Sequence, residues 1–111
     1  MPVLPNAEHA IIDLGKLHDY SLNLEHQRGK NKAVVFRSAL GFTQDDAERL
    51  QRLLLEAVNN VEAVETTPNQ YGRRFVVDVS MLGLRGTVTV RSTWIIRNEE
   101  DVPRMTSCYV L

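Results

Sequence analysis

The chain has 111 residues, of which 43% are hydrophobic and 24% charged, and its formal net charge is −1. A chain of this length and composition is typical of one folded domain, residues 1–111, with a single core. The near-neutral charge argues against a strong, sequence-independent nucleic-acid binder, because such binders need an excess of lysine and arginine. No apolar run approaches the roughly 20 residues of a membrane helix, and the start of the chain lacks the pattern of a secretory signal. We therefore expect a cytoplasmic protein.

The first half of the chain has the apolar spacing of helices. Asp13 can cap a first helix, and a second helix ends at Gly41. Thr43 can cap a third and longest helix, with Asp46 near the capping-box position. The apolar positions of the three helices are, in order, Leu17, Tyr20 and Leu24; Ala33, Phe36 and Leu40; and Ala47, Leu50, Leu54, Ala57 and Val58.

From Val61 onward β-forming residues dominate, and turn residues divide them into segments. We predict an edge strand over 61–66, a loop over 67–72, a hairpin of strands 73–82 and 87–96, and a last strand over 104–111. Helices followed by an antiparallel sheet make an α+β fold. About three helices should pack on one face of about four strands, against Phe75, Val90 and Trp94.

Alternation along the strands places polar side chains on the opposite face of the sheet. Arg91 and Thr93 should point away from Trp94, as should Asp78 and Ser80 on the neighbouring strand. Thr106 or Ser107, depending on the strand register, can add a hydroxyl. Such a patch of donors could hold a phosphate, although on pattern alone a solvated outer face is the commoner explanation.

A basic stretch precedes the second helix and begins with an imidazole, at His26. The cations that follow are Arg28, Lys30, Lys32 and Arg37, with no acid between Gln27 and Gln44. A histidine can move a proton near neutral pH, and neighbouring cations can hold a phosphate or a developing oxyanion. This combination suits metal-free attack on a phosphodiester, and it also suits a plain solvated loop. A second basic region contains Arg73, Arg74, Arg85, Arg91 and Arg97, with Asp78 as its only acid.

Other site chemistries have little support. The single cysteine, Cys108, excludes an internal disulfide and a cysteine-rich zinc site, and its apolar neighbours indicate a buried thiol. His9, His18 and His26 are too far apart in sequence to form the close ligand pair of a zinc site, and no carboxylate cluster suits magnesium. We predict no metal and no cofactor, and we expect His9 and His18 to lie on the surface.

Several segments, spread over nearly the whole chain, carry a resemblance to a known family: residues 4–7, 13–24, 26–36, 39–41, 71–75, 91–95 and 102–109. Together they resemble an uncharacterised bacterial family of small toxin-associated domains. The resemblance implies a stand-alone protein or the carboxy-terminal domain of a larger toxin, encoded beside a small partner. The layout is also similar to the ribonuclease toxin superfamily that includes barnase, EndoU, the colicin D and E5 tails and RelE.

These resemblances imply a toxin-like, metal-independent ribonuclease, with tRNA among its candidate substrates. Its partners would be RNA and a small immunity- or antitoxin-like protein. The implied roles are His26 as general base or acid, Lys30 or Lys32 as stabilising cation, Arg91 as bidentate phosphate ligand, and Thr93 or Thr106 as orienting hydroxyl. The alternatives are a noncatalytic interaction domain of a toxin system, or a module that binds a ligand or peptide along an exposed strand edge.

Overall fold

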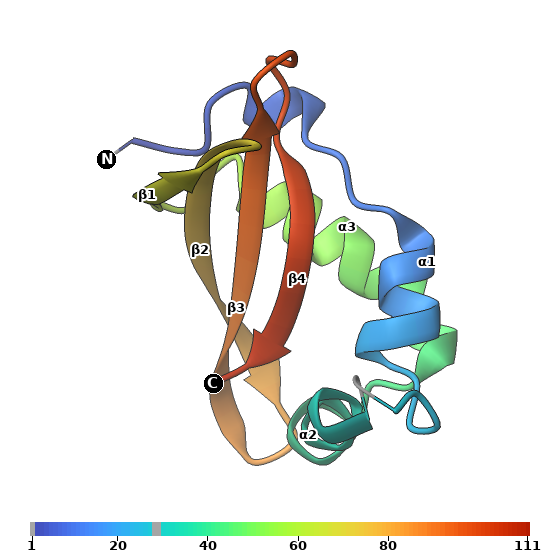
Figure 1. Ribbon diagram of the computed structural model, residues 1–111. Coiled ribbons are helices and arrows are strands. Elements are labelled where there is room, and N and C mark those ends of the chain that lie inside the picture. Colours follow the sequence, from blue (N-terminus) through green and yellow to red (C-terminus); the bar gives the residue numbers. More distant parts are fainter. Residues whose placement is uncertain (1, 28–29) are drawn as a thin grey trace.

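A computed structural model describes residues 2–27 and 30–111 of the chain, with the helices before the sheet, as predicted (Figure 1). None of the helices in these two ranges is long and apolar enough to cross a bilayer. The helical elements are η1 (Ala7–His9), α1 (Leu14–Lys16) with its π-helical continuation η2 (Leu17–Ser21), α2 (Lys30–Leu40), and η3 (Gln44–Asp46) leading into α3 (Ala47–Ala57). The strands are β1 (Ala63–Asn69), β2 (Gly72–Gly83), β3 (Gly86–Arg97) and β4 (Arg104–Val110).

The four strands form one antiparallel sheet in the order β1-β2-β3-β4, which confirms the predicted α+β fold and its central hairpin. The predicted end of the first strand is wrong, because β1 continues past Thr66 to Asn69. A proline lacks the N–H of a ladder bond, but an edge strand tolerates it, and Pro68 lies on such a strand. The Asn69 side chain then accepts the N–H groups of Tyr71 and Gly72 and closes a tight turn.

The first helix is also shorter than predicted, since its helical residues end at Ser21 and Leu24 is 38% exposed. The side chain of Asn23 accepts the N–H of Glu25 and donates to the carbonyl of Asp19. Such local side-chain bonds compete with the next helical turn.

The predicted helix boundaries at Asp13, Gly41 and Thr43 are confirmed. The Asp13 carboxylate accepts the Gly15 N–H at 2.9 Å, and the Thr43 N–H donates to the Asp46 carboxylate at 2.9 Å. Gly41 ends α2 with a φ of 73°, a left-handed conformation that favours glycine. Gly41 and Thr43 thus mark the junction between α2 and the helical segment formed by η3 and α3.

The helices cover one face of the sheet, which we call the inner face (Figure 1). Trp94 is 1% exposed, and its indole N–H donates to the Ser92 hydroxyl at 2.9 Å. Ser92 in turn donates to the Val77 carbonyl at 2.8 Å, so the polar atoms of this layer have partners. The core also contains Leu17, Phe36, Leu50, Leu54, Phe75, Val77 and Val90, as the apolar spacing predicted.

Candidate functional site

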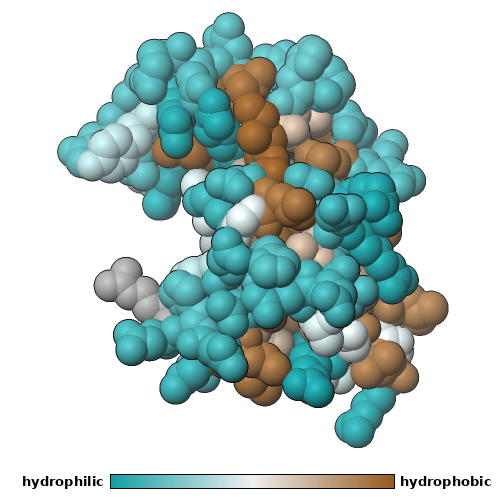
Figure 2. Space-filling view, turned by 90° about the vertical axis from the view of Figure 1, so that its right-hand side faces the viewer, coloured by the Kyte–Doolittle hydropathy of each residue, from teal (hydrophilic) through white to brown (hydrophobic). Residues whose placement is uncertain are grey.

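The opposite face of the sheet, the outer face, has no helix of the described chain over it (Figure 1). Figure 2 views the molecule from the side of α1, and the outline is hollowed on the left, which is the side of the outer face. Two open hollows lie on this face. One, of about 550 Å³, is lined by Val64, Val76, Asp78 and Arg91 among others, and one, of about 540 Å³, lies near the turn between β1 and β2.

Arg91 projects from β3 onto the outer face, directly across the strand pair from Asp78. Its guanidinium donates to both carboxylate oxygens, at 2.8 and 2.9 Å. These hydrogen bonds, with the charge of Arg91, hold the pKa of Asp78 below its ordinary value and raise the pKa of Arg91. The planar fork predicted to bind a phosphate is therefore occupied by Asp78. A phosphate here must use the remaining donors of Arg91 or displace the carboxylate.

The predicted hydroxyl patch is present, and both candidates on β4, Thr106 and Ser107, contribute to it. The Thr93 hydroxyl lies 2.6 Å from that of Thr106 and 2.8 Å from that of Ser107. Both contacts occur because the register of β3 and β4 shifts between Thr93 and Trp94, so that two β4 residues face Thr93. The cluster is half-exposed and adjoins Arg91 along β3.

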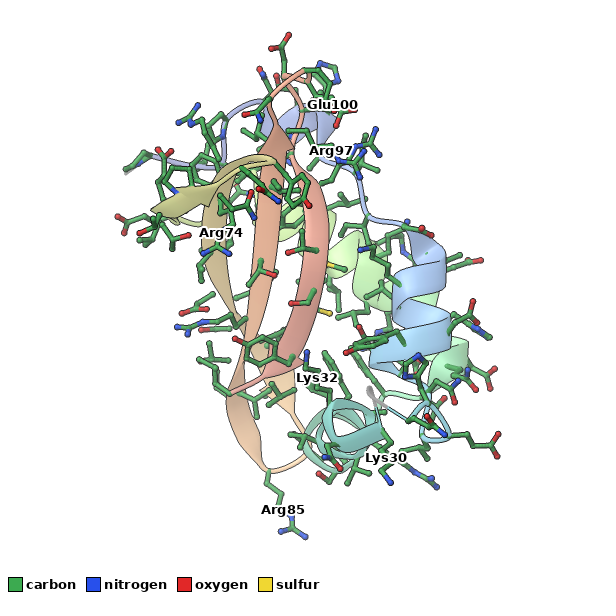
Figure 3. The ribbon with its side chains drawn as sticks, in the orientation of Figure 1. Lys30, Lys32, Arg74, Arg85, Arg97 and Glu100 are labelled. Carbon is green, nitrogen blue, oxygen red and sulfur yellow. The ribbon has the colours of Figure 1, made fainter. Side chains whose placement is uncertain are left out.

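Lys32 reaches from α2 to the end of β4, and it brings the basic stretch to the sheet (Figure 3). Its ammonium group lies 5.0 Å from the ring centre of Tyr109 and 5.6 Å from that of Tyr20. The ring of His26 packs edge-on against Tyr20, with 4.6 Å between ring centres. Tyr109 is the cross-strand neighbour of Arg91. These neighbours form a series that links His26 to Arg91. We call the series, together with the hydroxyls beside Arg91, the cluster.

Lys30 does not join this cluster. Figure 3 shows it on the side of α2 away from the sheet, whereas Lys32 points toward β4. Residues two apart on a helix face in different directions, so only one of the two candidate cations can serve the outer face. Arg28, which belongs to the same basic stretch, lies outside the described residues.

The second basic region does not form one positive surface. Arg73 donates to both carboxylate oxygens of Glu65, at 2.9 Å each, and Arg91 is similarly held by Asp78. Arg85 projects from the far end of the β2–β3 hairpin (Figure 3). Of the other arginines, Arg97 lines the hollow near the β1–β2 turn, and Arg74 donates to the carbonyl of Thr67 at 3.0 Å.

A family model described as "Domain of unknown function (DUF6883)" matches residues 3–111. The chain belongs to the DUF6883 family. No curated protein matches it. A chain of the solved "Contact-dependent growth inhibition toxin - immunity protein complex from Klebsiella pneumoniae 342" is similar in structure, with a TM-score of 0.61 and 15% sequence identity over 94% of this chain and 95% of that chain. A similarity at 15% identity shows that the two chains share a fold.

The remaining candidate groups of this DUF6883 domain lie outside the cluster. His9 and His18 are exposed, and the His18 Nδ1 lies 2.7 Å from the carboxylate of Asp19. Cys108 is buried, and burial raises the pKa of its thiol to about 11, which keeps it protonated at neutral pH. Within the described ranges, no three His, Cys, Asp or Glu residues gather as metal ligands.

The contacts of the aromatic members of the cluster were not predicted from the sequence. Tyr20 was predicted only as an apolar position of the first helix, whereas the ring of Tyr109, like those of Tyr71 and Trp94, is a candidate for stacking on a base. The pairing of Asp78 with Arg91 had a visible signal, because Asp78 is the only acid in the second basic region. The arrangement offers a cation, an imidazole, hydroxyls and aromatic faces beside an open concave surface.

Proposed function

We propose that this domain is the toxin component of a toxin–immunity system and that it cleaves RNA without a metal ion. The observation that carries the proposal is the position of Lys32 between the rings of Tyr20 and Tyr109, which links His26 to the Arg91 end of the outer face. The structural similarity to a chain of a toxin–immunity protein complex supports a role in such a system. Membership of the barnase and colicin ribonuclease superfamily is part of the same proposal.

The chemistry follows from the needs of RNA cleavage. The ribose 2′ oxygen gives up its proton and forms a bond to phosphorus, while the bond from phosphorus to the 5′ oxygen breaks and that oxygen gains a proton. His26 exchanges the proton of one of these two oxygens, and the open face gives solvent access to the other. Lys32 stabilises the negative charge of the phosphorane, and the remaining donors of Arg91 orient the phosphate. The hydroxyls of Thr93 and Thr106 position the ribose.

The two lysines of α2 provide a matched test. We expect the wild type to arrest bacterial growth and to fragment total RNA, and we expect Lys32→Ala, His26→Ala and Arg91→Ala to lose this effect. Removing a group that handles charge or protons in the transition state costs about 100-fold or more in rate. Lys30→Ala makes the same chemical change on the other side of α2 and should remain toxic. Tolerance of the wild-type gene without any partner protein, or equal loss in Lys30→Ala and Lys32→Ala, would contradict the proposal.

One observation favours a second function, a noncatalytic interaction domain of a toxin system. The fork of Arg91 is already held by Asp78, and the hydroxyls of Thr93, Thr106 and Ser107 contact one another. A surface whose polar groups pair internally is also what a protein-binding face requires. This function predicts that the purified domain leaves RNA intact and that none of the four variants changes bacterial growth.

A further inference from the structure

We propose that the hollow beneath the β1–β2 turn binds a single unpaired nucleobase of the RNA, with Tyr71 as its stacking face. This inference rests on the proposed function and adds a substrate-recognition site to it. The hollow has a volume of about 540 Å³ and is lined by Asn69, Tyr71, Ile95, Arg97, Glu99 and Thr106, among others. This volume lies within the range of small-ligand sites, roughly 300–1,000 Å³.

Tyr71 is 63% exposed although it sits in a rigid turn. Its N–H donates to the Asn69 side chain at 2.8 Å, and its carbonyl accepts the N–H of Asn98 at 2.9 Å. The Asn98 side chain also donates to the carbonyl of Gln70 at 2.8 Å. The ring is therefore presented to solvent by a backbone that is held from both sides. An exposed aromatic ring whose backbone is held in one position can stack a base, because every base has a π-face.

Gly72, the residue after Tyr71, sets how closely the start of β2 approaches β3. A Cβ atom at this position would lie 2.1 Å from the carbonyl oxygen of Ile96, which no side chain can accept. Only glycine lets β2 approach β3 this closely directly after the turn. The close approach holds Tyr71 over the same region of the outer face that Ile95 and Thr106 line.

The polar groups around the hollow suit a base and its phosphate. Both carboxylate oxygens of Glu100 are taken by Arg104, at 2.8 and 2.9 Å, whereas Arg97 approaches the same carboxylate only to 3.7 Å. Arg97 thus keeps donors for a phosphate oxygen. The carboxylate of Glu99 can accept hydrogen bonds from the amino or imino edge of a base, and Ile95 adds an apolar surface.

The position of the hollow on the outer face relates it to the catalytic cluster. Thr106 lines the hollow and also lies 2.6 Å from Thr93, which adjoins Arg91 along β3. A strand of RNA crossing the outer face would pass Lys32 and Tyr109, then the hydroxyls, and then Tyr71. A base can enter the hollow only if it is unstacked and unpaired, so the site selects single-stranded segments such as loops and ends.

The test compares Tyr71→Ala and Tyr71→Phe with Leu84→Ala, which removes another exposed side chain, 67% exposed, at the opposite end of the hairpin. The first probe is a fully 2′-O-methylated single-stranded oligonucleotide, which binds but cannot be cleaved, and its affinity is measured by fluorescence anisotropy. We expect Tyr71→Ala to weaken binding about tenfold, as for loss of one stacked base. We expect Tyr71→Phe and Leu84→Ala to bind like the wild type, and the matching duplex to bind weakly to all four proteins.

Cleavage of an unmodified oligonucleotide separates this inference from the proposed function. Binding of the probe that depends on Tyr71 supports the base site even if the wild type cleaves nothing, in which case only the proposed function fails. If the wild type cleaves RNA while Tyr71→Ala leaves both the KM and the affinity for the probe unchanged, the base site is overturned and the ribonuclease stands. The base site is also overturned if the wild type does not bind the probe, or if Tyr71→Ala weakens binding of a partner protein but not of RNA.

Discussion

The two faces of the sheet are built from alternate residues of the same strands, yet they differ in burial and in the partners of their polar side chains. On the inner face Ser92 and Trp94 are buried, and their polar side-chain atoms have defined partners: the indole N–H donates to the Ser92 hydroxyl, which donates to the Val77 carbonyl. On the outer face Arg91, Thr93 and Tyr109 are half-exposed, and their partners are other side chains that solvent can replace. Neighbouring positions therefore differ in what a substitution costs. The inner face stabilises the fold, and the outer face holds the side chains that a substrate or a partner can reach.

The largest expected difference between the faces is at Trp94 and Ile95, adjacent residues of β3. Trp94→Ala empties the centre of the core and should lower the free energy of unfolding by about 3–5 kcal/mol. Ile95→Ala removes a half-buried side chain from the outer face and should cost about 1 kcal/mol or less. Urea unfolding of both variants measures the difference. Equal losses would mean that the two faces are not energetically distinct.

Cys108 lies on the inner face, and its buried thiol should react far more slowly in the folded protein than in the unfolded chain. A pKa of about 11, raised by burial, leaves about a hundredfold less thiolate at pH 8 than an ordinary thiol. We expect an alkylating reagent to modify the native protein at least about 100-fold more slowly than the urea-unfolded chain, because burial also blocks access. Mass spectrometry at timed intervals measures both rates. Similar rates in the two states would show that this part of the inner face opens readily.

Ser92 and Thr93 are neighbours that each carry one hydroxyl, one on each face. Ser92→Ala removes the partner of the Trp94 indole N–H in a buried layer and should cost about 1–3 kcal/mol. Thr93→Val leaves the hydroxyls of Thr106 and Ser107 able to turn to water, so its effect should lie within about 0.5 kcal/mol. Thermal unfolding of the pair checks this ordering. A larger loss in Thr93→Val would mean that the outer hydroxyl cluster has a structural role.

Much of the fold was predictable, because alternation over two long strands and helical spacing before them are strong, local signals. The predictions failed at the end of the first helix and at the end of β1. At both places one asparagine, Asn23 or Asn69, forms side-chain bonds to nearby backbone groups. Whether such a bond replaces a helical turn or closes a hairpin depends on the path of the chain around it. Apolar spacing carries no information about that path.

The outer-face residues were predicted as a set, but most of their contacts were not. The pairing of Asp78 with Arg91 follows from counting outward from the β2–β3 turn, so the sequence contained that contact. The two partners of Thr93 depend on a register shift that strict alternation cannot express. The contact of Lys32 with Tyr109 joins a helix to the last strand, and no local pattern reports a contact between segments so far apart.

The smallest expected effect is the pH dependence of the exposed pair on the outer face. The hydrogen bonds from Arg91 lower the pKa of Asp78, so the pair stabilises the folded protein above the unfolded pKa, near pH 4, and this contribution is lost as the pH falls through the folded pKa. Asp78→Asn removes the titrating group, so the wild type should be slightly more stable than Asp78→Asn at pH 7, by less than the Ser92→Ala effect. The difference should shrink below about pH 4.

Glu65 and Glu100, whose pKa values are lowered by Arg73 and Arg104, are present in both proteins and cancel in the comparison. Urea unfolding of both proteins at pH 7, 5 and 3 measures the difference, and a gap that widens toward pH 3 would mean that Asp78 is not held by Arg91 in solution.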